Sequence, residues 1–438
     1  MSINRYREKL KNLSDRLVAI QKPILILDSI KWPVQQQENF INGRGRRLPD
    51  INQDYYDRLV PGFNPAVKQQ ELSELYHQVN TQLGKQDHLG KILKQTIRQY
   101  QMVIELLQHR GTSEFGVHSK QLYGSATDHL RGDRKTLIEL GERLCSIFSL
   151  PAAAHLSYSC PKDIKAEDAV RILDERLNGY FSSSSFNVQL SDGIVSDASA
   201  GGDCIKINTN SFFSSLDLQV LEVHEGWVHV GTTLNGRMQN WASWLSVGSP
   251  RITATQEGLA VLIETLTFNS YPGRARRISD RVIAIGMAEQ GADFYEVYNH
   301  FCEKGLTEKE SYVIAQRVFR GGDVRGGSYF TKDLSYVRGF VETVNFIKSA
   351  ILSDVPQLLP MLFVGKVTLD DIPVLYEYMN EGIISPPKYL PPMFRDLNGL
   401  YTWFGFSSGM SLVNLGRVQN HFEKMFAELQ KSLSQRDN

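Results

Sequence analysis

Cysteine is scarce in this chain of 438 residues, and the four that occur lie far apart: Cys145, Cys160, Cys204 and Cys302. No two of them form a Cys-x-x-Cys pair, so the sequence predicts no zinc ribbon, thiol redox motif or disulfide framework. The first residues are polar and contain no apolar signal region. No apolar run elsewhere is long enough to span a bilayer. We therefore expect a cytoplasmic protein that has no membrane partner.

An excess of charge of one sign is also lacking. The 48 Lys and Arg residues balance the 48 Asp and Glu residues, so no net field attracts nucleic acid or an anionic membrane. We expect no nucleic-acid partner. Apolar residues make up 42% of the chain, which is enough for an ordinary globular core, and the length allows more than one domain.

The pattern of apolar residues divides the chain into two parts. In the first third, apolar residues recur at helical spacing, as Leu10, Leu13 and Leu17 do. The composition then changes, and segments with strand patterns appear. We therefore predict an N-terminal helical region over residues 1–150. A second domain over residues 151–438 would carry the chemistry.

Two short segments alternate in the manner of β-strands, residues 186–190 and 204–208. Turn-forming residues at 191–193 and 200–203 separate them. From about residue 217 onward, most of the chain has helical periodicity. The sequence predicts a mostly helical α+β fold, with a small antiparallel sheet before a distorted helix that begins near residue 217. If the strand at 204–208 lies at a sheet edge, it could pair with an extended peptide.

The helix predicted after this sheet carries two histidines five residues apart, His224 and His229. On a regular helix this spacing separates two side chains by roughly 140° around the axis. Two such imidazoles cannot reach one metal ion. A π-bulge inserts one residue into a turn and would bring both rings to one face, and Gly226 would ease that distortion. Either the histidines are unrelated residues of the core or surface, or the helix is widened around them.

A carboxylate, Glu257, follows at the start of another apolar helical run. Two imidazoles and a carboxylate are the ligands of a catalytic zinc site that keeps an open position. The alternative is an acidic residue favoured by the dipole at a helix N-terminus. We predict that His224, His229 and Glu257 bind Zn²⁺, and that Glu225 takes a proton from a water held there. Two further acidic residues would either support the histidines or lie at the surface: Glu222 and Glu264.

Two blocks of sequence resemble one known family. The first is His-Glu-x-x-x-His at residues 224–229, followed by Gln-Glu-Gly-Leu-Ala at 256–260. The second is Arg-Val-Phe-Arg-Gly at 317–321, followed by Phe-Thr-Lys-Asp-Leu-Ser-Tyr-Val-Arg-Gly at 330–339. Over roughly residues 150–410 the chain is similar to the QEGLA-motif family, and its N-terminal helical region is also family-like. That family includes the microtubule-associated tyrosine carboxypeptidases, which remove the C-terminal tyrosine of α-tubulin, and bacterial flavohemoglobin expression-modulating proteins.

The resemblance implies a fold with a zinc-metallopeptidase-like core. It also implies that His224, His229 and Glu257 are the zinc ligands and that Glu225 is the catalytic base. The substrate stays open. The chain shows no long basic extension of the kind expected for microtubule binding, so it resembles the bacterial branch, and we expect a target other than tubulin.

Basic residues gather around the glycines of the second block: Arg317, Arg320, Arg325 and Lys332. A carboxypeptidase must hold the terminal carboxylate of its substrate, and a guanidinium fork or a lysine suits that task. We predict that Arg317, Arg320 and Lys332 bind substrate. Either Arg320 or Lys332 would hold the carboxylate, and Tyr336, four residues after Lys332 on one helix face, would donate to the tetrahedral oxyanion. The alternative for each is a structural salt bridge or hydrogen bond.

The sequence therefore favours a zinc-dependent carboxypeptidase that trims the C-terminal tail of a peptide or protein. Two alternatives stay open. One is another zinc hydrolase, such as an endopeptidase, an aminopeptidase or an amidase. The other is a regulatory protein that keeps the fold without turnover, although Glu225 argues against it, because a site without turnover needs no base. The oligomeric state does not follow from the sequence.

Overall fold

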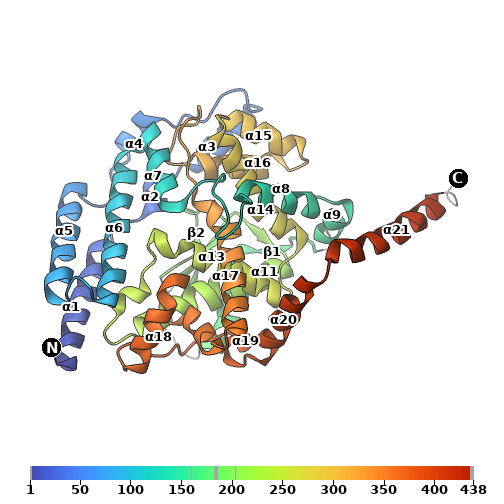
Figure 1. The fold of residues 1–438 in the computed structure, drawn as a ribbon. Helices are drawn as coiled ribbons and strands as arrows, with labels where there is room; N and C mark the ends of the chain where they lie inside the picture. The colour runs from blue at the N-terminus through green and yellow to red at the C-terminus, as the bar shows by residue number, and fades with distance from the viewer. Residues whose placement is uncertain (1, 159, 182–185, 203, 435–438) are drawn as a thin grey trace.

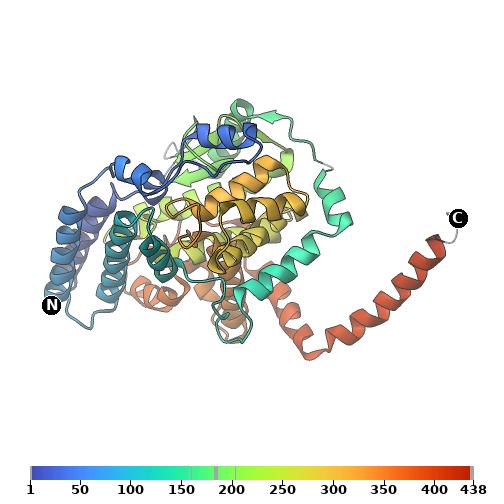
Figure 2. The same cartoon turned by 90° about the horizontal axis from the view of Figure 1, so that it is seen from above.

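The computed structural model describes residues 2–158, 160–181, 186–202 and 204–434. These residues are mostly helical and include two small sheets, which confirms the α+β class. Helices and sheets pack into one body, from which the C-terminal helix projects (Figures 1 and 2). Within the described part of the chain, no helix is both long and apolar enough to cross a membrane.

The first third of the chain is helical, as predicted. Its helices are α1 (Ile3–Gln21), α2 (Ile26–Ser29), α3 (Val34–Asn42), α4 (Gln53–Arg58), α5 (Pro65–Gln82), α6 (His88–Gln108), α7 (Ser113–Tyr123) and α8 (Leu137–Phe148). The apolar face predicted for α1 is buried, with Leu10, Leu13 and Leu17 facing inward. Helices α1, α5 and α6 pack side by side (Figure 1). The side chains of Asn64 and Asp87 begin α5 and α6 by accepting hydrogen bonds from backbone N–H groups.

These helices share a core with the second part of the chain. One apolar cluster joins residues of α1 and α6 to residues of α13 (Thr253–Leu266) and α17 (Ser335–Leu352). Packing is therefore continuous across residue 150, and the division of the chain at that point stays a prediction.

Most of the second part is also helical. The remaining helices are α9 (Pro151–Tyr158), α10 (Ala166–Phe181), α11 (Ser215–Leu221), α12 (Gly231–Arg237), α14 (Pro272–Glu289), α15 (Phe294–Glu303), α16 (Glu308–Phe319), α18 (Ile372–Asn380), α19 (Pro392–Arg395), α20 (Asn398–Gly409) and α21 (Leu415–Ser434). Short 3₁₀ turns occupy Ser243–Ser246, Pro250–Ile252, Lys332–Leu334, Pro356–Phe363, Leu369–Asp371 and Met410–Leu412.

A three-stranded sheet precedes the histidine-bearing helix. It consists of β2 (Asn187–Ser191), β4 (Cys204–Asn208) and β3 (Ala198–Gly201), in that spatial order. Strand β4 is antiparallel to β3 but parallel to β2, so the prediction of an antiparallel sheet is wrong for this pair. The cause is the path of the chain. After β3 the chain turns back, and β4 lies between β3 and β2. Strand β4 is therefore antiparallel to β3 and runs in the same direction as β2. A separate antiparallel pair joins β1 (Ile164–Lys165) to β5 (Phe212–Phe213).

Two further details of the sheet differ from expectation. The turn predicted at residues 200–203 begins too early, because Ala200 and Gly201 belong to strand β3. Strand β4 is central, with a partner on both sides, so it has no free edge for a peptide. The edge strands are β2 and β3, and β3 lies beside the histidine-bearing helix.

The helix with the two histidines is widened, as their spacing predicted. Helix α11 passes into a π-helix over Glu222–Val230, which continues as α12. Near its centre a Cβ atom on Gly226 would overlap the Leu177 side chain of α10. A larger residue at this position would therefore require the Leu177 side chain to shift, so glycine suits the close packing here in addition to the conformational freedom expected from the sequence.

Helices α13 and α17 cross in direct backbone contact. A Cβ atom on Gly258 would overlap the backbone carbonyl of Gly339. Only glycine permits backbones to approach so closely. Because of this crossing, Lys332, on the 3₁₀ turn before α17, lies next to Glu257 on α13.

Candidate metal centre

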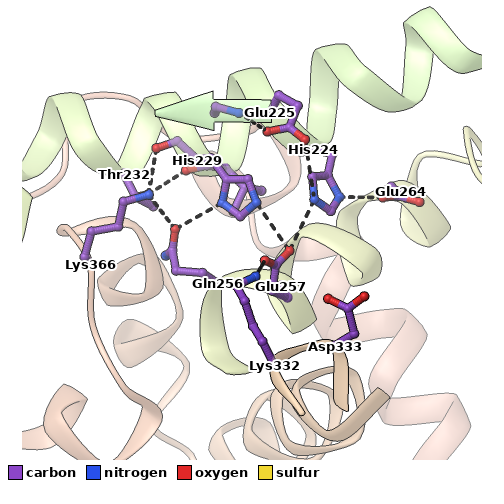
Figure 3. Close-up of polar contacts among 12 residues, drawn as sticks. His224, Glu225, His229, Thr232, Gln256, Glu257, Glu264, Lys332, Asp333 and Lys366 are labelled. Carbon is purple, nitrogen blue, oxygen red and sulfur yellow. Dashed lines mark hydrogen bonds and ion pairs between the residues drawn. The ribbon is translucent and has the colours of Figure 1, made fainter. Parts of the chain in front are cut away.

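Three predicted ligands meet between the π-helix and α13. His224 Nε2 and His229 Nε2 lie 3.5 Å and 3.6 Å from the same oxygen of Glu257, Oε2. The centroids of the two imidazole rings are 4.8 Å apart. Within the described residues, these three side chains form a group that could hold a metal ion, with one ligand atom from each within 4.8 Å of the others (Figure 3).

The Glu257 carboxylate fits a metal ion better than it fits its protein neighbours. Its Oε1 accepts a hydrogen bond from Lys332 Nζ at 3.0 Å. Its Oε2 is buried and has no hydrogen-bond partner among the described residues. Burial would raise the pKa of Glu257, but Lys332 and the two histidines hold it well below the usual range. An ionised, buried oxygen without a donor is costly, and a cation at this point would offset that cost.

Glu264 fixes the orientation of the His224 ring by binding its Nδ1 atom. The Nδ1–H group of His224 donates to Glu264 Oε1 at 2.6 Å, and Glu264 also accepts from Arg274 of α14 at 3.0 Å. With Nδ1 so engaged, Nε2 faces Glu257 and is free to act as a ligand. Burial disfavours the imidazolium form, yet Glu257 and Glu264 raise the pKa of His224 to about 10. The surroundings favour a positive charge here, and a bound metal would replace the proton.

A second network holds His229. Its Nδ1 lies 3.4 Å from Gln256 Oε1, which also accepts from Thr232 Oγ1 at 3.0 Å and from Lys366 Nζ at 2.8 Å. Lys366 donates in addition to the backbone oxygen of His229 at 2.9 Å. Burial lowers the pKa of Lys366 to about 7. Gln256 thus orients the second imidazole much as Glu264 orients the first.

Glu225 lies at the rim of the ligand group. Its Oε1 is 4.0 Å from His224 Nε2. Its Oε2 accepts a hydrogen bond of 2.7 Å from the backbone N–H of Ala200 on edge strand β3 (Figure 3). The strand therefore holds one oxygen of this carboxylate and leaves the other beside His224.

The other two acidic candidates have different partners. Glu264 is fully buried against His224, so it supports a histidine. Glu222 instead pairs with Arg176 at 3.3 Å. No hydrogen bond or ion pair among the described residues joins Glu222 to the ligand group.

The basic residues of the second block have different surroundings. Arg317 forms a two-pronged ion pair with Asp333, at 2.5 Å from Nε and 2.9 Å from Nη2, and so its guanidinium is already occupied. Lys332 lies on a 3₁₀ turn before α17 and bonds to Glu257. Arg325 is exposed and pairs with Asp323.

Comparison with known proteins assigns this chain to one family. A sequence model described as microtubule-associated tyrosine carboxypeptidase matches residues 38–412 of this chain. The chain belongs to that family. No curated protein matches it. The resemblance drawn from the two sequence blocks is confirmed, and at the family level it assigns peptidase activity of the carboxypeptidase kind.

A member of the tyrosine carboxypeptidase family needs a cation for the terminal carboxylate of its substrate, so the surroundings of the basic side chains near the ligand group matter. Arg320 is buried, and its Nε has no hydrogen-bond partner among the described residues. Arg281 of α14 likewise keeps Nη1 unpartnered, while its Nε lies 3.6 Å from Asp333. Burial and the nearby Arg317 lower the pKa of Arg320 to about 10. Positive charge is thus in excess at this point, because three largely buried arginines face one carboxylate.

Tyr336 connects these cations to the ligand group. Its ring stacks on His224, with centroids 6.4 Å apart and an angle of 22° between the planes. The Arg281 guanidinium lies 4.8 Å from the centroid of the Tyr336 ring, and Lys332 Nζ lies 5.8 Å from it. The structure therefore brings both sequence blocks of this carboxypeptidase family into one site.

Sequence reasoning missed three members of the site: Arg281, Lys366 and Gln256. Gln256 belongs to the Gln-Glu-Gly-Leu-Ala motif, so its place directly before a ligand was a usable signal. Lys366 and Arg281 stand in no motif and reach the site through tertiary packing alone.

Proposed function

We propose that this protein is a zinc-dependent carboxypeptidase that removes residues from the C-terminal tail of a peptide or protein. The observation that carries the proposal is the buried Oε2 of Glu257, which makes no hydrogen bond to the described residues and lies 3.5 Å and 3.6 Å from two imidazole nitrogens. A His-His-Glu set with a spare glutamate is the ligand chemistry of catalytic zinc sites. The four cysteines form no disulfide within the described residues, which suits a reducing compartment, and we place the reaction in the cytoplasm.

In this proposal His224, His229 and Glu257 are the residues that would hold a zinc ion. When bound, zinc supplies Lewis acidity, which lowers the pKa of a water to about 7 and polarises the scissile carbonyl. Glu225 Oε1 takes the proton from the attacking water, while the Ala200 N–H keeps Oε2 in place. The same carboxyl group then delivers the proton to the leaving amine.

The substrate carboxylate is assigned to Arg320, with Arg281 beside it. Arg317 and Lys332 are engaged by Asp333 and Glu257, whereas Arg320 and Arg281 keep guanidinium nitrogens without partners among the described residues. A carboxylate ligand would satisfy those buried donors and offset the excess positive charge. Lys332 then acts mainly on Glu257.

Tyr336 is assigned to the oxyanion of the tetrahedral intermediate. Its ring packs between His224 and Arg281, and its position between the ligand group and the cations suits a hydroxyl that donates to developing negative charge.

Cleavage of a peptide library, read by mass spectrometry, tests the proposal. We expect products shortened from the C-terminus and no cleavage of the same peptides when their C-terminus is amidated. Equal cleavage of free and amidated peptides would favour an endopeptidase or amidase. Shortening from the N-terminus would favour an aminopeptidase.

Replacing Arg320 with glutamine should selectively slow the hydrolysis of peptides that have a free C-terminal carboxylate (free-acid peptides). Loss of one partner of a buried charge pair costs about 2–5 kcal/mol, so kcat/KM for free-acid peptides should fall by roughly 30-fold to 5,000-fold. The matched control is Arg325→Gln, whose side chain is exposed and pairs with Asp323. Equal losses in both variants, or no loss in Arg320→Gln, would remove Arg320 from the carboxylate site.

Replacing Gln256 with leucine should weaken zinc binding. The change removes the acceptor shared by His229, Thr232 and Lys366. Loss of such an outer partner typically costs about 10–100-fold in metal affinity. Competition with a chromophoric chelator measures the zinc Kd, and Gln290→Leu, at the exposed end of α14, serves as control. An unchanged Kd would show that the network does not orient the ligand.

A further inference from the structure

The C-terminal end of the chain exposes a large amount of apolar surface. Every residue from 411 to 431 is exposed, and α21 projects away from the body (Figures 1 and 2). Twelve large apolar side chains form what we call the C-terminal stripe: Tyr401, Trp403, Phe406, Met410, Leu412, Val413, Leu415, Val418, Phe422, Met425, Phe426 and Leu429. Contiguous exposed apolar surface on this scale marks an interaction site.

The spacing of the stripe on α21 is suited to a helical partner. Leu415, Val418, Phe422, Met425 and Leu429 follow one another at alternating intervals of three and four residues. That pattern places them on one narrow face, as in the seam between two paired helices. An isolated helix of this length is only marginally stable in water, so packing of the seam would stabilise α21.

The charges beside the stripe favour a second copy of the chain over a membrane. The helix carries Arg417, Lys424 and Lys431 together with Glu423 and Glu428. Helices that lie on membranes are rich in basic residues on the polar face, which this mixture is not. His421 and Glu428 flank the seam on one side, so an antiparallel pair of α21 helices places each of them toward the other on the partner helix.

The available area also fits a stable dimer. The aromatic members of the stripe are each about half exposed or more, from 46% for Phe422 to 74% for Phe406. A whole aromatic side chain buries about 150–250 Å², so Phe422 and Phe426, each about half exposed, offer roughly 200 Å² on α21. With the four other stripe members of the same helix, α21 offers on the order of ~500 Å² per partner, which reaches the ~1,000 Å² in total that a specific interface needs.

We propose that the C-terminal stripe is the interface of a homodimer, in which α21 pairs antiparallel with α21 of a second copy of this chain. Such a pair is two-fold symmetric and closes on itself, as most soluble homo-oligomers do. The inference rests on residues far from the metal centre and is independent of the proposed function.

Analytical ultracentrifugation of the full chain tests the dimer. We expect twice the 49.6 kDa of one chain for the wild type, with dissociation on dilution. Phe422→Glu puts a charge at the centre of the seam and should sediment as a monomer, with the thermal unfolding of the body unchanged and helical circular dichroism reduced by no more than the share of α21. Asn420→Glu places the same charge on the opposite face of α21 and should remain a dimer. Leu429→Glu provides a second break in the seam.

Three outcomes would overturn the proposal. A wild type that is monomeric throughout the concentration series excludes the dimer. A Phe422→Glu or Leu429→Glu variant that stays dimeric places the interface elsewhere. A monomeric wild type that floats with vesicles of anionic phospholipid would assign the stripe to a membrane surface instead.

Discussion

Replacing Glu225 with glutamine should remove nearly all peptide hydrolysis while the protein keeps its zinc. Glutamine preserves the size of the side chain, and its oxygen can still accept from the Ala200 N–H. It can no longer take a proton from water. A positioned general base contributes about 10²–10⁴-fold, so kcat for a free-acid peptide should fall by that factor. Zinc content is measured on the same sample.

The matched control for this change is Glu222→Gln. Glu222 lies on the same π-helix but pairs with Arg176, away from the ligand group. Its replacement should leave kcat close to the wild-type value. Wild-type kcat in Glu225→Gln would show that another group is the base, and loss of zinc from that variant would show that Glu225 has a structural part in the site.

Replacing Glu257 with glutamine should remove both zinc and activity. The amide oxygen can still accept from Lys332, so the crossing of α13 and α17 should persist. A neutral amide, however, does not supply the anionic oxygen that the site offers to a metal. Without the metal the rate should approach the uncatalysed one, a loss on the order of 10⁶-fold or more. Zinc per chain after dialysis and single-turnover hydrolysis measure the two effects.

Glu289→Gln is the control for this second change. Glu289 is a half-buried carboxylate at the end of α14 that accepts from Ser125 and Ala126. Its loss alters a buried hydrogen-bond network without touching the ligand group, so zinc should stay bound. Full zinc content in Glu257→Gln would contradict the assignment of Glu257 as a ligand.

The local geometry of the site was predictable from the sequence because it depends on a few neighbouring residues. Five-residue spacing of His224 and His229 allows a shared metal only if the helix is widened, and the chain forms a π-helix there. Glu257 was predictable from the chemistry of zinc ligands. The helical character of the first third was predictable from apolar periodicity, which local sequence determines.

The cation cluster was only partly predictable, since its members depend on tertiary packing. Arg317 and Arg320 stand in one sequence block, but nothing in the sequence shows that Asp333 occupies Arg317 and leaves Arg320 with an unpartnered nitrogen. Arg281 and Lys366 come from separate segments. They reach the site because helices cross closely, as at the contact between Gly258 and Gly339.

The direction of strand pairing was also beyond the sequence. Alternation in residues 186–190 and 204–208 predicts that these segments are strands, but it carries no information on which strand lies between the others. The insertion of β4 between β2 and β3 is a property of the chain path. Its consequence for the site is that β3, and not β4, presents its edge to Glu225.

X-ray absorption at the zinc edge, on the chain purified without chelators, tests the central claim most directly. The proposed function predicts one bound zinc with nitrogen and oxygen ligands alone, including two imidazoles at about 2.0–2.1 Å. Scattering from a sulfur ligand at about 2.3 Å would show that a cysteine binds the metal instead. A chain that contains no zinc would contradict the metal centre formed by His224, His229 and Glu257.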